Sequence, residues 1–333
     1  MTPRHANKFM FFLMLYQMVS SILVMLAFFI LRDGFEFNIH YKALLITSQI
    51  VSFVIPFFIY LAIKRCKIRD VLDLKRISLT NIILITLLMI FVQPMMMFLS
   101  AVSTLFFPNN VSTVIEMLFT GSLPLLILTI AVTPAICEEI IFRGVIASGY
   151  KKIDLKTACL VNGFLFGIMH RDPQQFLYAF ILGSVFYLFL HYTSSIFAPI
   201  LAHFVVNGSQ AFLAHSVLSM EYYQQYAYSM PDIDVSIFEG NETIMAIIFT
   251  AILSVVALPF FIWIFSYFVK HNKAKGNLLH MSDDLEFDLD IRDSVTNQPY
   301  NAEEEGKEEG AHKVVDIYLI LTVVLFIVSL IIF

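Results

Sequence analysis

Apolar stretches of membrane-spanning length recur along most of the chain, and they limit its fold more than any other feature. A helix that crosses the hydrocarbon core of a bilayer needs about 20 predominantly apolar residues. On that measure the sequence contains about nine candidate membrane helices. They lie near residues 9–31, 41–63, 78–100, 123–148, 156–171, 175–192, 194–214, 243–269 and 314–333, and the fifth to seventh are short for a span.

The composition supports the same class of protein. The chain is 59% hydrophobic and only 14% charged, which excludes a soluble globular protein. Backbone polar groups inside a bilayer must be hydrogen-bonded within the protein. We therefore predict an all-α fold: a polytopic integral membrane helical bundle with about 8–9 transmembrane helices. The first apolar run exceeds the ~7–15-residue core of a signal peptide, so we expect it to be retained as a membrane helix.

The placement of Lys and Arg predicts the orientation of the bundle. Basic residues gather in the N-terminal tail and in the loops after the second, fourth and eighth apolar segments, whereas the alternate loops are poor in them. Cytoplasmic loops carry such an excess. We therefore expect a multi-pass protein of the cell (plasma) membrane with a cytoplasmic N-terminus. No basic block suited to nucleic acid is present in the sequence.

Five regions follow from these patterns. Residues 68–77 mix apolar and basic positions at helical spacing, which predicts a short interfacial helix on the cytoplasmic side. Residues 271–313 are hydrophilic and acidic, which predicts a disordered cytoplasmic segment. That segment could dock a protein partner, although its composition favours a solvated linker. The regions are the N-terminal helices 1–122, a central core 123–214, an outer loop and helix 215–270, the acidic segment 271–313 and a last helix 314–333.

The central core carries charges at a depth where charges are rare. Residues Pro124–Tyr150 begin as an apolar helix and then contain Glu138, Glu139 and Arg143. Glu139 and Arg143 are four residues apart, so they share a helix face and can pair. Glu138 lies about 100° further round the helix and lacks that partner. An unpaired carboxylate in a cavity of low polarity is suited to general acid–base chemistry, although a purely structural ion network would also explain these charges.

Two further pairs of polar or aromatic residues lie in the next apolar segments. Phe166 and His170 are four residues apart, as are His203 and Asn207. Their expected depths overlap that of Glu138 within the uncertainty of the helix ends, so the three helices can build one buried polar site. Such a site can activate water directly or through a metal, and the amide and one imidazole can stabilise an oxyanion. Hydrogen bonding between helices is the structural alternative for the same residues.

The three motifs together resemble a known family. Glu138–Arg143 reads EExxxR, Phe166–His170 reads FxxxH and His203–Asn207 reads HxxxN, in the order found in the CPBP intramembrane proteases, which include the CAAX prenyl endopeptidases and the bacterial Abi proteins. The resemblance covers about residues 124–214 and makes 123–214 the expected catalytic core. It implies that Glu138 and His170 activate water, that His203 and Asn207 form the oxyanion side, and that Glu139, Arg143 and Phe166 support them. If a metal such as zinc is used, its implied ligands are His170, His203 and Glu138.

These observations predict an intramembrane endopeptidase of a membrane-embedded peptide or protein, possible roles being bacteriocin or peptide processing or self-immunity. The lipid bilayer is its expected surrounding. One alternative is a catalytically silent membrane scaffold or regulator of envelope signalling that uses the acidic segment. Another is a proton-coupled transporter, since buried carboxylates and histidines also form proton relays. The transporter is disfavoured because the sequence lacks repeats and paired broken helices.

Overall fold

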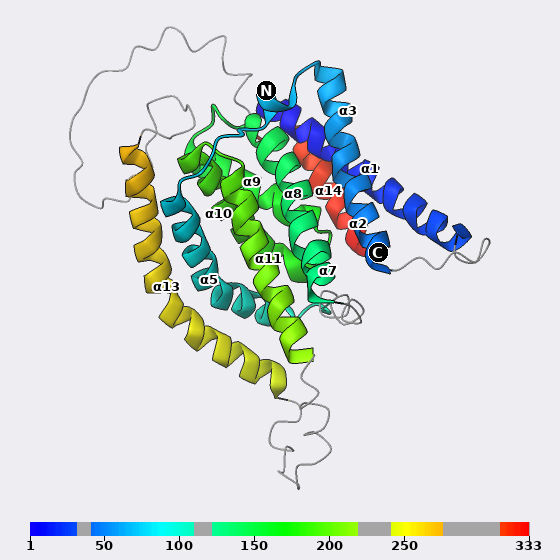
Figure 1. The fold of residues 1–333 in the computed structure, drawn as a ribbon. Helices are drawn as coiled ribbons and strands as arrows, with labels where there is room; N and C mark the ends of the chain where they lie inside the picture. Colours follow the sequence, from blue (N-terminus) through cyan, green and yellow to red (C-terminus); the bar gives the residue numbers. More distant parts are fainter. Residues whose placement is uncertain (32–40, 110–121, 219–240, 276–313, 333) are drawn as a thin grey trace.

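A computed structural model describes residues 1–31, 41–109, 122–218, 241–275 and 314–332. Within these ranges the protein is helical and contains no strand, and each predicted apolar segment forms a helix (Figure 1). The all-α membrane fold is therefore confirmed. Residues 276–313, which include most of the predicted acidic segment, and residues 219–240 of the predicted outer loop lie outside the described residues.

The N-terminal part contributes three long helical stretches. The first is one helix, the second passes without interruption through a π-helical turn, and the third follows a short helix. Their elements are α1 (Pro3–Phe29), α2 (Tyr41–Gln49), η2 (Ile50–Val54), α3 (Ile55–Lys64), α4 (Ile68–Val71) and α5 (Leu79–Ser103).

The remaining helices form the central core and the C-terminal part. The central charged helix contains two π-helical stretches, one on each side of α8. The elements are α7 (Leu123–Ile127), η3 (Leu128–Val132), α8 (Thr133–Glu139), η4 (Ile140–Ile146), α9 (Leu155–Met169), α10 (Pro173–Thr193), α11 (Phe197–Leu218), α13 (Glu242–Ala274) and α14 (Ile317–Ile332).

Seven helices in the described ranges are long and apolar enough to cross a membrane, and α9 and α14 are shorter apolar helices. The segments near 175–192 and 194–214 were expected to be short for a span, but α10 has 21 residues and α11 has 22. Both gain length beyond the apolar run because polar residues at their ends remain helical. Of the three segments expected to be short, only α9, with 15 residues, is short. At 1.5 Å per residue it is about 22 Å long, less than a typical hydrocarbon core.

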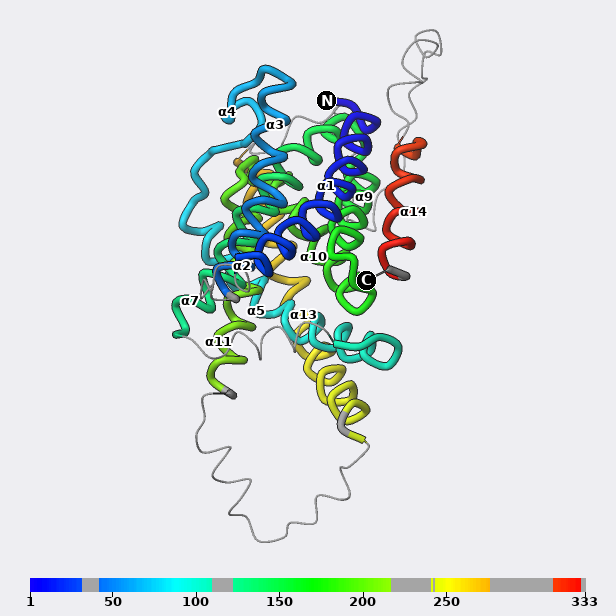
Figure 2. The backbone as a smooth tube through the Cα atoms, turned by 90° about the vertical axis from the view of Figure 1, so that its right-hand side faces the viewer, coloured from blue at the N-terminus to red at the C-terminus, as the bar shows by residue number. Residues whose placement is uncertain are grey.

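The bundle is built from pairs of adjacent helices (Figures 1 and 2). α13 packs along α5, α9 packs antiparallel to α10, and α14 lies beside α1. α11 contacts α5 on one side and the α7–α8 helix on the other, so it lies in the middle of the bundle. This position places the HxxxN motif of α11 directly against the EExxxR helix.

The α9–α10 pair packs so closely that it requires glycine. A Cβ atom added at Gly163 would lie 2.0 Å from Oγ of Ser184, and one added at Gly183 would lie 2.7 Å from Cβ of Phe166. Such distances are impossible for real side chains, so the two backbones approach closely only because these positions are glycine. The close approach brings Phe166 and the C-terminal end of α9 against the centre of the bundle.

The predicted interfacial helix near 68–77 is present only as the four-residue α4, and the prediction is wrong for the rest of that range. From Leu72 the backbone is extended. The carbonyl of Asp73 accepts a hydrogen bond from the amide of Ile196 at 2.9 Å. Leu72 lies against Gly144, where an added Cβ would be 2.4 Å from its Cδ2 atom. These tertiary contacts hold the segment extended, because a helix would withdraw its carbonyl from the α10–α11 turn.

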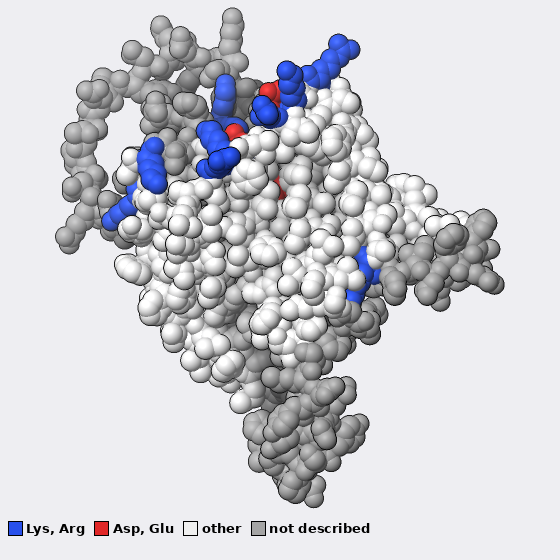
Figure 3. All heavy atoms as spheres, viewed as in Figure 1, with Lys and Arg blue, Asp and Glu red and all other residues white. Residues whose placement is uncertain are grey.

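Basic residues gather at one end of the molecule. Figure 3 shows Lys and Arg concentrated at the end where the N-terminus lies, above a largely uncharged body. The end of α3, the turn before α9 and the end of α13 all lie there. We call this the basic end. The uncharged body below it exposes large apolar side chains on α1, α5 and α13, as expected of surfaces that face lipid.

Candidate active site

A cavity of about 440 Å³ opens in the middle of the bundle. Its walls come from α1, α2 and η2 on one side and from η3, α8, α9, α10 and α11 on the other. The predicted site residues that line it are Glu138, Phe166, His170, His203 and Asn207. The structure therefore brings together residues from the three helices that the sequence analysis expected to share one site.

Glu139 connects two helices beneath this cavity and is fully buried. Its Oε2 atom lies 3.1 Å from Nε of Arg143, which confirms the predicted ion pair within the helix. Its Oε1 atom lies 2.9 Å from Nδ1 of His203 on α11. Both carboxylate oxygens are thus occupied. The contact with His203 was not predicted, since the sequence analysis paired Glu139 with Arg143 alone.

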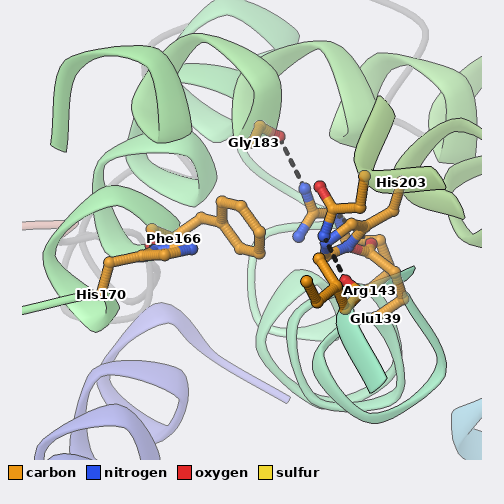
Figure 4. Close-up of polar contacts among 8 residues, drawn as sticks. Glu139, Arg143, Phe166, His170, Gly183 and His203 are labelled. Carbon is orange, nitrogen blue, oxygen red and sulfur yellow. Dashed lines mark hydrogen bonds and ion pairs between the residues drawn. The ribbon is translucent and has the colours of Figure 1, made fainter. Parts of the chain in front are cut away.

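Arg143 is held by aromatic rings as well as by charge. Its guanidinium carbon lies 4.9 Å from the ring centre of Phe166 and 5.5 Å from that of Phe186, while Nη2 donates to the carbonyl of Gly183 at 2.9 Å. Cation–π contacts strengthen when the cation is removed from water. Figure 4 shows the Phe166 ring between His170 on one side and Arg143 and His203 on the other. The ring of Phe166 therefore lies between His170 and the guanidinium of Arg143.

Glu138 differs from Glu139 in its contacts and in its position at the cavity. It is 9% exposed, lines the cavity and makes no hydrogen bond or ion pair within the part of the chain that the structure describes. Because Glu139 has taken Arg143 and His203, Glu138 keeps both oxygens for whatever occupies the cavity. This arrangement matches the division between the two carboxylates that their spacing suggests.

His170 is oriented by its own helix. It follows the last residue of α9, and its Nδ1 atom lies 2.9 Å from the carbonyl oxygen of Phe166. A carbonyl can only accept a hydrogen bond, so Nδ1 carries the hydrogen. In the neutral ring Nε2 is then an unprotonated acceptor. The local geometry thus prepares His170 to receive a proton at Nε2.

His203 and Asn207 are one turn apart on α11, and neighbouring helices fix both. The contact with Glu139 occupies Nδ1 of His203, and the ring stacks on Phe186 at 5.4 Å between centres. Nδ2 of Asn207 donates to the carbonyl of Ile130 in η3 at 3.1 Å. The amide has a second hydrogen that this bond does not use. Nε2 of His203 and that second hydrogen are the groups left for the cavity.

The implied zinc ligands do not form a zinc site in this arrangement. His170, His203 and Glu138 line one cavity, yet no group of three or more His, Cys, Asp or Glu among the described residues is placed to hold a metal ion. Structural and catalytic zinc sites use at least three such protein ligands. We therefore assign no chemical step to a metal, and the use of zinc stays a prediction for experiment.

The sequence did not predict two contacts of Arg143. Phe186 and the Gly183 carbonyl both lie on α10 and contact Arg143, although neither belongs to a polar motif. The only signal was indirect: a buried guanidinium has five hydrogens to satisfy, and Glu139 alone cannot satisfy them. The π-helical stretches η3 and η4 were also unpredicted, and such turns are frequent at functional sites.

The fold and this site define a polytopic helical membrane protein with carboxylate, guanidinium and imidazole groups gathered at a cavity inside its bundle. Residues 120–209 match the family described as Type II CAAX prenyl endopeptidase Rce1-like. The chain is also 34% identical over 87 residues to the candidate membrane peptidase YdiL of Bacillus subtilis (strain 168). This region of the chain is therefore similar to the CPBP/CAAX proteases. No solved structure matches the chain significantly.

The match is limited in extent. It covers 26% of this chain and 36% of the Bacillus protein, so the chain spans about a third of the length of that relative. The family match, over residues 120–209, contains all three motifs and most of the residues that surround the cavity from η3 to α11. α1, α2, α5, α13 and α14 lie outside it.

Proposed function

We propose that this protein is an intramembrane endopeptidase that hydrolyses a peptide bond of a membrane-associated peptide or protein. The observation that carries the proposal is the contrast between the two adjacent carboxylates. Glu139 contacts both Arg143 and His203, whereas Glu138 faces the cavity and neither of its oxygens is bonded to any residue that the structure describes. A structural ion network does not require Glu138, whereas a carboxylate that acts as a general base must be of this kind, without a partner that holds its charge.

The first chemical step is the activation of water. A water molecule between Glu138 and Nε2 of His170 loses a proton to this pair as its oxygen attacks the scissile carbonyl. His170 can accept because the Phe166 carbonyl holds the hydrogen on Nδ1. The proton then passes to the leaving amine as the tetrahedral intermediate collapses. Two products result, one with a new carboxylate and one with a new amine.

The second requirement is a site for the negative charge that develops on the carbonyl oxygen. The free amide hydrogen of Asn207 and Nε2 of His203 are the donors for it. For Nε2 to donate while Nδ1 donates to Glu139, His203 must be doubly protonated. With Glu138 and Glu139 ionised and Arg143 charged, the four side chains then sum to zero. This balance limits the cost of burying them together.

The substrate class follows from the place of the site. The cavity lies within a bundle of membrane-spanning helices, so a membrane-embedded peptide or protein can reach it from the bilayer. The basic end supports an orientation in which that end, with the N-terminus, faces the cytoplasm of a plasma membrane. A peptide leader, bacteriocin precursor or lipid-modified peptide would each fit these conditions.

Replacement of Glu138 tests the proposal directly. The protein would be purified in detergent, reconstituted in lipid vesicles and offered quenched-fluorescent apolar peptides, each with and without a prenylated cysteine. We expect wild type to cleave at least one of them. Glu138→Gln should reduce kcat by at least about a hundredfold, the scale of a lost general base, without changing thermal stability. His170→Ala should act similarly.

A matched control is Gln175→Asn, which changes another polar cavity residue but none of the proposed reacting groups. It should retain cleavage. If Glu138→Gln and His170→Ala both cleave the peptides at the wild-type rate while folding normally, the protease proposal is wrong. Full cellular function of Glu138→Gln together with loss of function on deletion of residues 276–310 would favour the scaffold instead.

A further inference from the structure

The wall of the cavity opposite the catalytic helices is unexpectedly polar. It is formed by α1 and the α2–η2 stretch, which lie outside the region matched by the protease family. Both stretches are apolar membrane helices, yet they turn amide and hydroxyl side chains toward the cavity. We call these residues the polar wall: Gln17, Ser21, Ser48, Gln49 and Ser52.

Most of the polar wall is satisfied by local hydrogen bonds. Oγ of Ser21 donates to the carbonyl of Gln17 at 2.6 Å, and Oγ of Ser48 donates to the carbonyl of Leu45 at 2.7 Å. Nε2 of Gln17 donates to the carbonyl of Ser52 at 3.4 Å. These bonds stay within α1, within α2, or between α1 and η2. They give the side chains of Gln17, Ser21 and Ser48 partners within the protein.

Gln49 is the exception. Its Oε1 atom is buried and has no hydrogen-bond partner among the described residues. A buried acceptor without a partner costs about 1–3 kcal/mol. Because Gln49 lines the cavity, this acceptor can bind a group that enters the cavity.

The position of Gln49 is rigidly supported. It is the last residue of α2 and directly precedes the π-helical turn η2. Tyr16 donates to the carbonyl of Val51 at 3.0 Å, and Gln17 donates to that of Ser52, so α1 binds the turn at two successive carbonyls. A π-helical turn inserted in a membrane helix at a cavity is typical of functional sites. The turn and its two bonds fix the direction in which Gln49 faces.

We propose that the polar wall binds the backbone of the substrate, with Oε1 of Gln49 accepting a hydrogen bond from one substrate N–H. This inference rests on the proposed protease function. A peptide must be extended around its scissile bond to be hydrolysed, and its N–H and C=O groups then need partners inside the membrane. Water activated by Glu138 attacks the scissile carbonyl from one side of the cavity, and the polar wall holds the chain from the other.

The chemistry of the wall also defines the substrate class. Amides and hydroxyls recognise backbone groups, and within the polar wall there is no charged side chain to select a charged residue. The substrates are therefore apolar or weakly polar segments chosen by their capacity to extend. Side-chain sequence near the scissile bond matters less than the availability of one backbone N–H.

Kinetics with modified peptides test this contact. The probe is the quenched-fluorescent peptide that wild type cleaves, prepared as a series in which each backbone N–H in turn is methylated. We expect Gln49→Leu to raise KM roughly tenfold, the effect of one lost hydrogen bond, with kcat little changed. One methylated position should impair wild type by a similar factor and have no further effect on Gln49→Leu.

Thr47→Val is the matched control, because Thr47 lies on α2 two residues away, is exposed and does not line the cavity. It should leave KM unchanged. The proposal is overturned if Gln49→Leu and Thr47→Val behave alike, or if every methylated peptide is impaired equally in wild type and Gln49→Leu. That second result would mean that Oε1 binds only water.

A measurement of peptide binding in a variant that cannot cleave tests the polar wall independently of the protease function. A photo-crosslinking amino acid would be placed at position 48 or at position 47 in the Glu138→Gln protein. The probe would be a fluorescent apolar peptide in the same vesicles. Crosslinking at position 48 well above that at position 47 supports the polar wall as the peptide-binding surface, even if no peptide is cleaved by wild type. Equal or absent crosslinking at both positions overturns it.

Discussion

Oε1 of Glu139 lies 2.9 Å from Nδ1 of His203, a contact between residues 64 positions apart. It joins the EExxxR helix to the HxxxN helix and leaves the other oxygen of Glu139 to Arg143. The second glutamate of the doublet is therefore the residue that holds the site together. Glu138 has no hydrogen-bond or ion-pair partner among the described residues, because Glu139 takes both Arg143 and His203.

Replacement of Glu139 should damage the fold as well as activity. Glu139→Gln leaves Arg143 buried without its counter-charge, a loss of about 3–5 kcal/mol. We expect a strong fall in the detergent melting temperature and in the yield of folded protein. The double change Glu139→Gln with Arg143→Met should recover part of that stability while remaining inactive. Equal melting of the single and double variants would contradict the role of the ion pair.

Gly183→Ala tests the close approach of α9 and α10. The added methyl group would lie 2.7 Å from Cβ of Phe166, so the helices must separate or Phe166 must move. We expect a destabilisation of about 1–3 kcal/mol and a loss of cleavage, because Phe166 packs on both histidines. Gly208→Ala is the control, since its methyl would meet nothing closer than 3.7 Å. Thermal unfolding and kcat should be nearly unchanged in that variant.

Two buried asparagines bind α5 to α13. Nδ2 of Asn81 donates to Oδ1 of Asn272 at 2.9 Å, and the reverse bond is 3.0 Å. Asn81→Leu should lower the free energy of unfolding by about 1–3 kcal/mol, because the buried amide of Asn272 loses its side-chain partner. The double change to Leu at both positions should cost clearly less than the sum of the single changes. Additive losses in a double-mutant cycle of unfolding free energies would rule out a direct coupling.

The tyrosine at the end of the central helix is expected to make stability depend on alkaline pH. Tyr150 donates to Oδ1 of Asn7, which also binds Asp316 through Nδ2 at 3.0 Å. Burial, then Asp316 and Tyr187, raise the pKa of Tyr150. The folded protein thus holds the phenol proton more tightly than the unfolded chain does. Its contribution is complete below about pH 10 and is lost as the pH rises through the folded pKa.

Tyr150→Phe tests this expectation. It should lower stability at neutral pH by about 1–3 kcal/mol, because Asn7 loses a buried donor. It should also remove part of the alkaline loss above about pH 10. Melting temperatures of wild type and variant across pH 7–11 provide the measurement. Parallel curves would show that Tyr150 is not the titrating group.

A chelator distinguishes direct activation of water from metal catalysis. The described residues do not place three ligands for a metal, so cleavage by Glu138 and His170 should survive prolonged treatment with a strong chelator. Elemental analysis of the purified protein should find less than one zinc per chain. Loss of cleavage that added zinc restores would show that substrate binding assembles a metal site from these residues.

Much of the architecture could be predicted from the sequence, because it depends on local composition. A long apolar run in a bilayer has no stable alternative to a helix, so the nine segments and their approximate bounds follow directly. The Glu139–Arg143 pair follows from helical spacing, and its geometry is confirmed. The ordered motifs led to the family that the comparison supports.

Tertiary contacts decided the rest. The segment that follows α4, residues 72–77, is not helical because the turn between α10 and α11 binds its backbone, and no local signal in the segment reveals that partner. His203 contacts Glu139, and Phe186 contacts Arg143, because the bundle places α11 and α10 against the central helix. The sequence alone determined which side chains had to find partners inside a membrane. Only the packing of distant helices decided that Glu139, and not Glu138, has these partners. The reason is that the choice of partner depends on distances between helices, which the spacing of residues along one helix does not give.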